Sequence, residues 1–103
     1  MSGIGVDLET SDVDPRLHRI LLDDVERAQL WPNRDRRTLR SLLCAKEAGF
    51  KALSDCRDAH GGLFWRVRLS QCGGMLWARA GEEQALVRGG ATESFAFAVA
   101  ERL

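Results

Sequence analysis

Apolar and polar positions alternate at the start of the chain. Ile4, Val6 and Leu8 are separated by residues that are small or acidic. A period of two is typical of a strand with one buried face, so we expect these three apolar side chains to be the buried ones. Asp7 and Glu9 would then project together from the opposite, solvent-facing side.

The pattern then becomes helical. Pro15 suits the first turn of a helix and predicts a short helix over residues 16–22. Asp23 or Asp24 is expected to cap a second helix that runs towards Leu30.

A longer helix is predicted from about residue 35 to residue 54. Apolar residues recur there at spacings of three, four and seven, which favours an amphipathic helix. These residues are Leu39, Leu42, Leu43, Phe50 and Leu53. Ala45, Ala48 and Ala52 lie between them and are small enough to let this helix approach a neighbouring element closely.

After residues 58–62 the period returns to two. It predicts strands over residues 63–70, 75–80, 84–88 and 94–101. Residues 71–74 (Gln71-Cys72-Gly73-Gly74) would connect the first two of these strands as a hairpin, and Gly89 and Gly90 would separate the last two. One strand, then helices, then several strands predict an α+β fold with helices packed on one face of an antiparallel sheet.

Composition narrows the class of protein. The chain has 103 residues, 45% of them hydrophobic, which predicts one domain over residues 1–103. The 15 basic and 15 acidic residues balance, so we expect no general attraction to nucleic acid or to an anionic membrane. No apolar run reaches the roughly 20 residues of a membrane span, and no secretory signal is recognisable. We therefore expect a cytoplasmic protein.

The cysteines do not indicate a metal or redox site. Cys44, Cys56 and Cys72 are widely spaced and odd in number, and they form no zinc pattern with His18 or His60. Reduced thiols are the simpler interpretation.

The acidic residues allow two interpretations. Asp7 and Glu9 on a strand are commonly part of an ordinary solvated face, but two carboxylates are also ligands that Mg²⁺ prefers. Glu47 and Lys51 are four apart on the predicted helix and could form a surface ion pair worth about 0.3–0.5 kcal/mol. If the helix lies close to the strand, Glu47 becomes a third carboxylate, with Lys51 beside a bound phosphate.

Two segments carry a resemblance to a known family. They are GIGVDLE at residues 3–9 and CAKEAGFKAL at residues 44–53. In this order they resemble the two signature motifs of the 4'-phosphopantetheinyl transferases, (I/V)-G-(I/V)-D and (F/W)-(S/C/T)-x-K-E-(A/S)-x-x-K. The closest resemblance is to the C-terminal half of the surfactin- and siderophore-synthetase-type enzymes. Leu43 departs from the pattern, since the family usually has Phe or Trp there.

The resemblance implies a fold and a reaction. It implies a transferase-like half-domain that moves the phosphopantetheine arm of coenzyme A onto a serine of an acyl or peptidyl carrier protein. By position in the motifs, Asp7, Glu9 and Glu47 would bind Mg²⁺, and Glu47 would also help to deprotonate the serine. Lys51 would contact phosphate and neutralise the leaving group, and Lys46 would add a phosphate contact.

The length leaves two further alternatives open. The larger enzymes of the family have two similar halves, and this chain begins at the motif of the second half. We therefore expect either a homo-oligomer (or association with a partner half) that completes the site, or an inactive half that only docks carrier proteins.

A basic cluster on the long helix is the remaining candidate feature. It consists of Arg34, Arg36, Arg37 and Arg40. We interpret it mainly as a solvated helix face; the alternative is contact with the coenzyme A 3'-phosphate or with an acidic carrier protein. It barely supports nucleic-acid binding, because no nucleic-acid-binding motif accompanies it.

Overall fold

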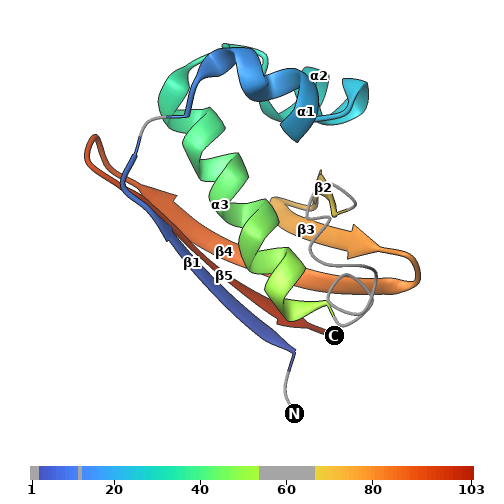
Figure 1. Cartoon of the computed structure of the whole chain (residues 1–103). Coiled ribbons are helices and arrows are strands. Elements are labelled where there is room, and N and C mark those ends of the chain that lie inside the picture. Colours follow the sequence, from blue (N-terminus) through green and yellow to red (C-terminus); the bar gives the residue numbers. More distant parts are fainter. Residues whose placement is uncertain (1–2, 12, 54–66) are drawn as a thin grey trace.

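A computed structural model describes residues 3–11, 13–53 and 67–103. They form an α+β domain in which a five-stranded antiparallel sheet carries its helices on one face (Figure 1). The strands are β1 (Ile4–Glu9), β2 (Arg68–Cys72), β3 (Met75–Ala80), β4 (Glu83–Ala91) and β5 (Ala96–Arg102). Their order in the sheet is β1-β5-β4-β3-β2, so β1, although first in the chain, pairs with the last strand. The predicted fold class is confirmed at this level.

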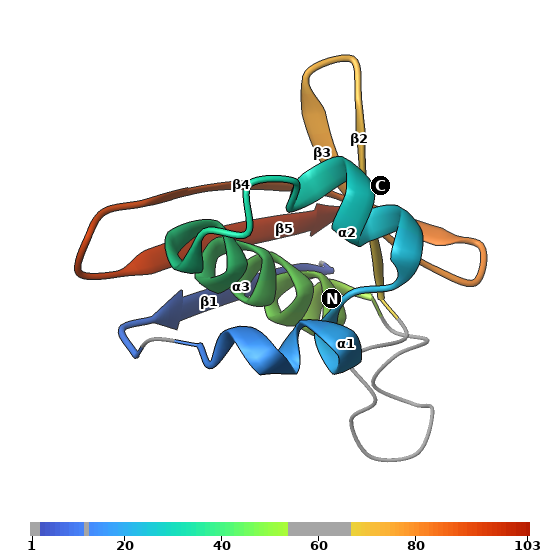
Figure 2. The ribbon, with the colours of Figure 1, turned by 90° about the horizontal axis from the view of Figure 1, so that it is seen from above.

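The long helix α3 (Arg36–Ala52) lies along the inner face of the sheet, where it contacts β1, β5 and β4. A 3₁₀ turn (Pro15–Leu17) and two short helices, α1 (His18–Leu21) and α2 (Asp24–Leu30), lie beside it (Figure 2). The apolar core lies between these helices and the sheet, and includes Leu21, Leu22, Trp31, Leu39, Leu53 and Val67.

Acidic caps set where the helices begin. The Asp23 carboxylate accepts a hydrogen bond from the Glu26 amide, and the Glu26 carboxylate accepts one from the Asp23 amide, which is a reciprocal capping box. The Asp35 side chain accepts from the first amides of α3. The predicted helix starts near residues 23 and 35 are therefore confirmed. The predicted helix over residues 16–22 is shorter and begins with the 3₁₀ turn at Pro15.

The strand predictions are partly confirmed. Strand β3 has the predicted bounds. The hairpin predicted around residues 71–74 is present, but its turn is shorter: β2 continues through Gln71 and Cys72, and Gly73 and Gly74 form the turn with φ of 61° and 77°. The predicted break at Gly89 and Gly90 is wrong, because β4 continues through both glycines in register with β5. The ring of Phe97 covers Gly90, 3.1 Å from where a Cβ would lie, and so replaces the missing side chain. The first residues of the predicted strand 63–70 lie outside the described part of the chain, as do Cys56 and His60.

The burial expected for β1 is reversed. Ile4, Val6 and Leu8 are 50–60% exposed, whereas Gly5 and Asp7 are buried against α3. Most of the inner face of the sheet is formed instead by small buried residues, namely Ala78, Ala85, Ala96, Ala98 and Ala100, together with Leu69 and Val87. These small residues allow a close approach of the helix. The large apolar residues consequently lie on the outer face.

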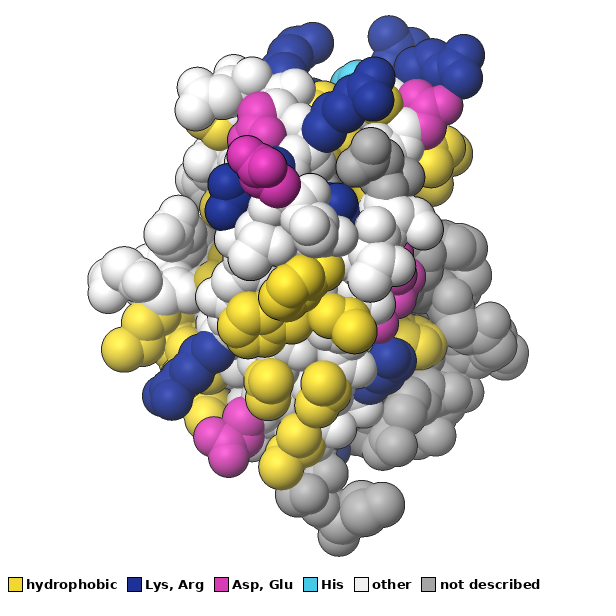
Figure 3. Space-filling view, turned by 90° about the vertical axis from the view of Figure 1, so that its left-hand side faces the viewer, with side chains coloured by type: hydrophobic (Ala, Val, Ile, Leu, Met, Phe, Trp, Pro, Cys, Tyr) yellow, Lys and Arg dark blue, Asp and Glu magenta, His cyan; other side chains and the backbone are white. Residues whose placement is uncertain are grey.

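We call this surface the outer face: Ile4, Val6 and Leu8 of β1, with Phe97 and Val99 of β5, which are 45% and 40% exposed. Val6 pairs with Val99 and Leu8 with Phe97, so the five side chains form one continuous group. Figure 3 shows hydrophobic side chains gathered on this face, with acidic and basic side chains beside them. No described helix covers the outer face.

A buried ion pair joins three elements on the inner side. Lys46 Nζ of α3 donates to Glu26 Oε1 of α2 at 2.9 Å, and both side chains are only 2% exposed. Glu26 Oε2 also accepts from the Leu69 amide of β2 at 2.7 Å. A buried charge that loses its partner is strongly unfavourable, so the pair fixes α2, α3 and β2 relative to one another.

The ion pair predicts a pattern of stabilities. Lys46→Met and Glu26→Leu should each lower the free energy of unfolding by about 3–5 kcal/mol, because each leaves one charge buried and unpaired. The double variant should lose clearly less than the sum, since no unpaired charge remains. Urea denaturation of the four proteins measures the coupling. Additive losses would show that the pair is not coupled.

Candidate metal centre

Three carboxylates from two elements meet at the interface of β1 and α3. Asp7 and Glu9 come from β1 and Glu47 from α3, and each offers an oxygen within 4.8 Å of the others. Asp7 is buried, while Glu9 and Glu47 are half-buried. We call these residues the acidic cluster. The structure therefore brings together the three residues that were predicted as metal ligands.

The cluster forms because β1 approaches α3 at backbone distance. A Cβ on Gly5 would lie 1.9 Å from the carbonyl oxygen of Ala48, so only glycine fits there. Two residues further on, Asp7 points to the same side of the strand as Gly5 and therefore at the helix. The Cys44 thiol donates to the backbone oxygen of Asp7 at 3.3 Å and fixes the strand at that residue.

Lys51 joins the same site from the next turn of α3. Its Nζ donates to the backbone oxygen of Val6 at 2.9 Å and to Asp7 Oδ1 at 3.2 Å. The ion pair of Lys51 is therefore made with Asp7, across the interface, and not with Glu47 along the helix. Because the Lys51 side chain remains 51% exposed, its ammonium can also meet a ligand from solvent.

The electrostatics of the cluster favour an added positive charge. The pKa of Glu47 is raised from 4.5 to about 7, first by burial, then by a hydrogen bond that the protonated group shares with Asp7 and by the charges of Asp7 and Glu9. Lys51 only partly offsets these effects. With the carboxyls ionised, the buried Asp7 Oδ2 has no hydrogen-bond partner among the described residues. A cation bound there would satisfy this oxygen.

The cluster has the chemistry of a site for a hard divalent cation. Mg²⁺ binds carboxylate oxygens at about 2.1 Å, so two of its ligands lie at most about 4.2 Å apart. The widest separation that the cluster allows, 4.8 Å, exceeds this by a few tenths of an ångström. A small side-chain rotation, or one ligand bound through water, closes the difference, and Mg²⁺ commonly retains several waters. The donor set thus fits Mg²⁺ or Mn²⁺.

The structure places Lys46 elsewhere. Its Nζ is buried and donates to Glu26, so it is not presented to a phosphate at the acidic cluster. The buried position of Lys46 therefore does not support its predicted contact with a phosphate. The importance of Glu26 was missed at the sequence level, although the Asp-x-x-Glu spacing from Asp23 is a recognisable capping-box signal.

The basic cluster is not one uniform solvated face. Arg40 is buried and donates to the backbone oxygens of Thr92 and Glu93 at 2.8 and 3.0 Å. Arg37 donates to the backbone oxygen of Ala91. These two arginines hold the connection between β4 and β5, so only part of the predicted cluster remains for ligands.

Comparison with known proteins does not assign the chain to a family. No family model matches it, and no curated protein matches it. Among the described residues, no helix has the length and apolar character that crossing a membrane would require.

The raised pKa of Glu47 predicts how the stability of the cation-free protein depends on pH. A carboxyl whose pKa is higher in the folded state contributes stability that is complete below about pH 4.5 and is lost as the pH rises through about 7. In the presence of chelator, wild type should therefore lose stability over this range relative to Glu47→Gln. Denaturation midpoints of both proteins at several pH values measure the difference, and equal slopes would contradict the prediction.

A second prediction concerns the thiols. Cys44 is fully buried, and burial, followed by its hydrogen bond to Asp7, raises the pKa of its thiol to about 12. Because the thiolate is the reactive form, Cys44 should stay unmodified by a maleimide in the native protein, whereas the exposed Cys72 should react. Peptide mass spectrometry after labelling distinguishes the two sites. Equal labelling of Cys44 and Cys72 would show that the β1–α3 interface opens readily.

Proposed function

We propose that the protein is a Mg²⁺-dependent 4'-phosphopantetheinyl transferase that acts on a serine of an acyl or peptidyl carrier protein, with coenzyme A as co-substrate. The observation that carries the proposal is the acidic cluster with Lys51 beside it. The two motifs that resemble the family's signatures lie far apart in the sequence, and their acidic residues meet at one interface. A chance pair of short motifs would not be expected to converge in this way.

The chemistry of the donor set supports a phosphoryl-transfer reaction. Such reactions depend mainly on positioning and on neutralising the charge of the phosphates. Asp7, Glu9 and Glu47 would hold the cation, which when bound supplies positive charge to the pyrophosphate of coenzyme A. Lys51, half exposed at the edge of the cluster, would contact a phosphate and neutralise the leaving group. Glu47 would accept the proton of the attacking serine.

Association with a second copy or with a partner half remains part of the proposal. The five apolar side chains of the outer face are 40–60% exposed, and contiguous apolar patches are typical of interaction surfaces. The oligomeric mass, measured by sedimentation in the same buffer as the activity, tests this expectation.

The proposal is tested by transfer of a fluorescent coenzyme A analogue to an apo carrier protein. Asp7→Asn and Glu47→Gln should each lower the labelling rate at least about a hundredfold, because each removes a ligand of the charge-neutralising cation. Chelation of divalent cations should abolish labelling, and added Mg²⁺ should restore it. Glu82→Gln, which changes an exposed carboxylate in the β3–β4 turn, is the matched control and should label like wild type.

Electron paramagnetic resonance of added Mn²⁺ measures cation binding and distinguishes the reasons why labelling could be absent. Cation binding without labelling, together with binding of the carrier protein, would favour the inactive docking module. Neither cation binding nor labelling in the folded wild type would overturn the proposal.

A further inference from the structure

The sheet has a gap between β3 and β4. These strands pair from Ala80 with Glu83 to Leu76 with Val87. Beyond Val87, β4 continues to Ala91 alongside β5, but the β2–β3 hairpin turns away from it (Figure 2). Strand β4 is thus paired on both edges over its first half and, among the described residues, on one edge only over its second half.

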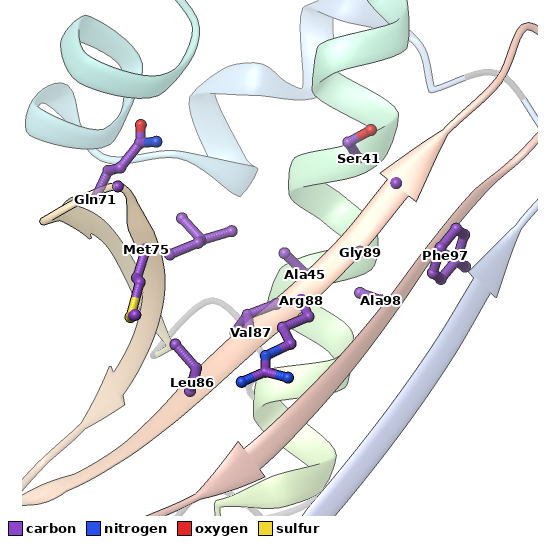
Figure 4. A pocket seen from close by; sticks show the side chains of 13 residues that line it. Ser41, Ala45, Gln71, Met75, Leu86, Val87, Arg88, Gly89, Phe97 and Ala98 are labelled. Carbon is purple, nitrogen blue, oxygen red and sulfur yellow. The ribbon is translucent and has the colours of Figure 1, made fainter.

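A groove of about 490 Å³ occupies this gap. Helix α3 lies behind it with Ser41 and Ala45, and Leu76 and Val87 line it from the strands. Figure 4 shows Ser41, Ala45 and Val87 around the gap, with Met75 on the β3 side and Arg88 at the front. The groove lies on a different side of α3 from the acidic cluster and shares no residue with it.

The backbone at the groove offers an open strand edge. The Gln84 oxygen accepts a hydrogen bond from the Leu103 amide, so Gln84 faces the β5 side. Because successive residues of a strand direct their backbone groups to opposite edges, Gly89 directs its N–H and C=O to the β3 side, into the groove. Gly89 has no side chain that could block access to this edge, and at Gly90 the ring of Phe97 lies where a side chain would be.

A positively charged side chain lies beside the open edge. Arg88 is exposed, lines the groove and forms no ion pair with any described residue. Its guanidinium is a fork of donors that suits a carboxylate in bidentate geometry. The groove therefore combines backbone donors and acceptors, an apolar floor and one exposed positive charge.

We propose that this groove binds an extended, acidic peptide segment of a partner protein as an added strand beside β4. The added strand would hydrogen-bond to the backbone of Gly89 in the manner of β-augmentation. Since its side chains alternate between two faces, one set would enter the groove above Ala45 and the other would place a carboxylate against Arg88. The recognised sequence would alternate apolar and acidic residues. This inference does not rest on the proposed transferase function.

Selection from a random library of short linear peptides displayed on phage, against the full chain, tests the proposal. Enriched peptides should alternate apolar and acidic residues, and synthetic copies should bind at least about tenfold more weakly to Arg88→Glu, where like charges meet. Arg79→Glu is the matched control, because Arg79 is an exposed arginine on the adjacent strand that does not line the groove. Its affinity should equal that of wild type.

A backbone control distinguishes strand addition from simple charge attraction. Copies of the peptides with alternate amides N-methylated keep their charge but cannot pair along one edge, and they should lose binding. The proposal is overturned if no peptide is enriched, if Arg88→Glu binds as tightly as Arg79→Glu, or if N-methylated peptides bind as well as the unmodified ones. Urea denaturation of both variants confirms that they are folded.

Discussion

The contact between the backbones of β1 and α3 is the constraint on which the site depends. At Gly5 the strand lies so close to the Ala48 carbonyl that no side chain fits between them. This distance buries Asp7, brings Glu47 within reach of it and lets Lys51 reach the backbone of Val6. The acidic cluster is therefore a consequence of helix–strand packing. Its three carboxylates lie close together at this interface, with Asp7 buried and Glu9 and Glu47 half-buried.

The buried pair of Glu26 and Lys46 complements this contact by fixing the rotation of α3. Lys46 and Glu47 are consecutive, so their side chains leave the helix about 100° apart. With Lys46 directed at Glu26 in α2, Glu47 is directed towards β1. One residue of the Lys-Glu pair thus orients the helix, and the next contributes to the site. The adjacent position of the two residues in the sequence has a structural explanation that is independent of any phosphate contact by Lys46.

Much of the fold could be predicted from the sequence because its signals are local. The Asp23 cap, the turn at Gly73 and the period of α3 each depend on neighbouring residues. The orientation of β1 could not be predicted, since period two shows that two faces differ but not which one is buried. Large apolar residues usually face the core. Here α3 lies so close to the inner face of β1 and β5 that glycine and alanine occupy it. The three carboxylates were predicted from the strand and helix patterns together with the motif resemblance, whereas the groove beside Gly89 depends on where β3 leaves β4.

The alanine-lined interface also affects how the domain becomes ordered. Alanine and glycine lose no side-chain rotamer freedom on burial, whereas leucine or methionine would each lose roughly half to two kcal/mol. Most of the face of the sheet that packs on α3 is formed by Ala78, Ala85, Ala96, Ala98 and Ala100. The helix and sheet can therefore dock without selecting among alternative rotamers at this surface. A larger side chain at one of these sheet positions would require a smaller side chain on the facing part of α3. Substitutions at these positions should therefore occur in compensating pairs.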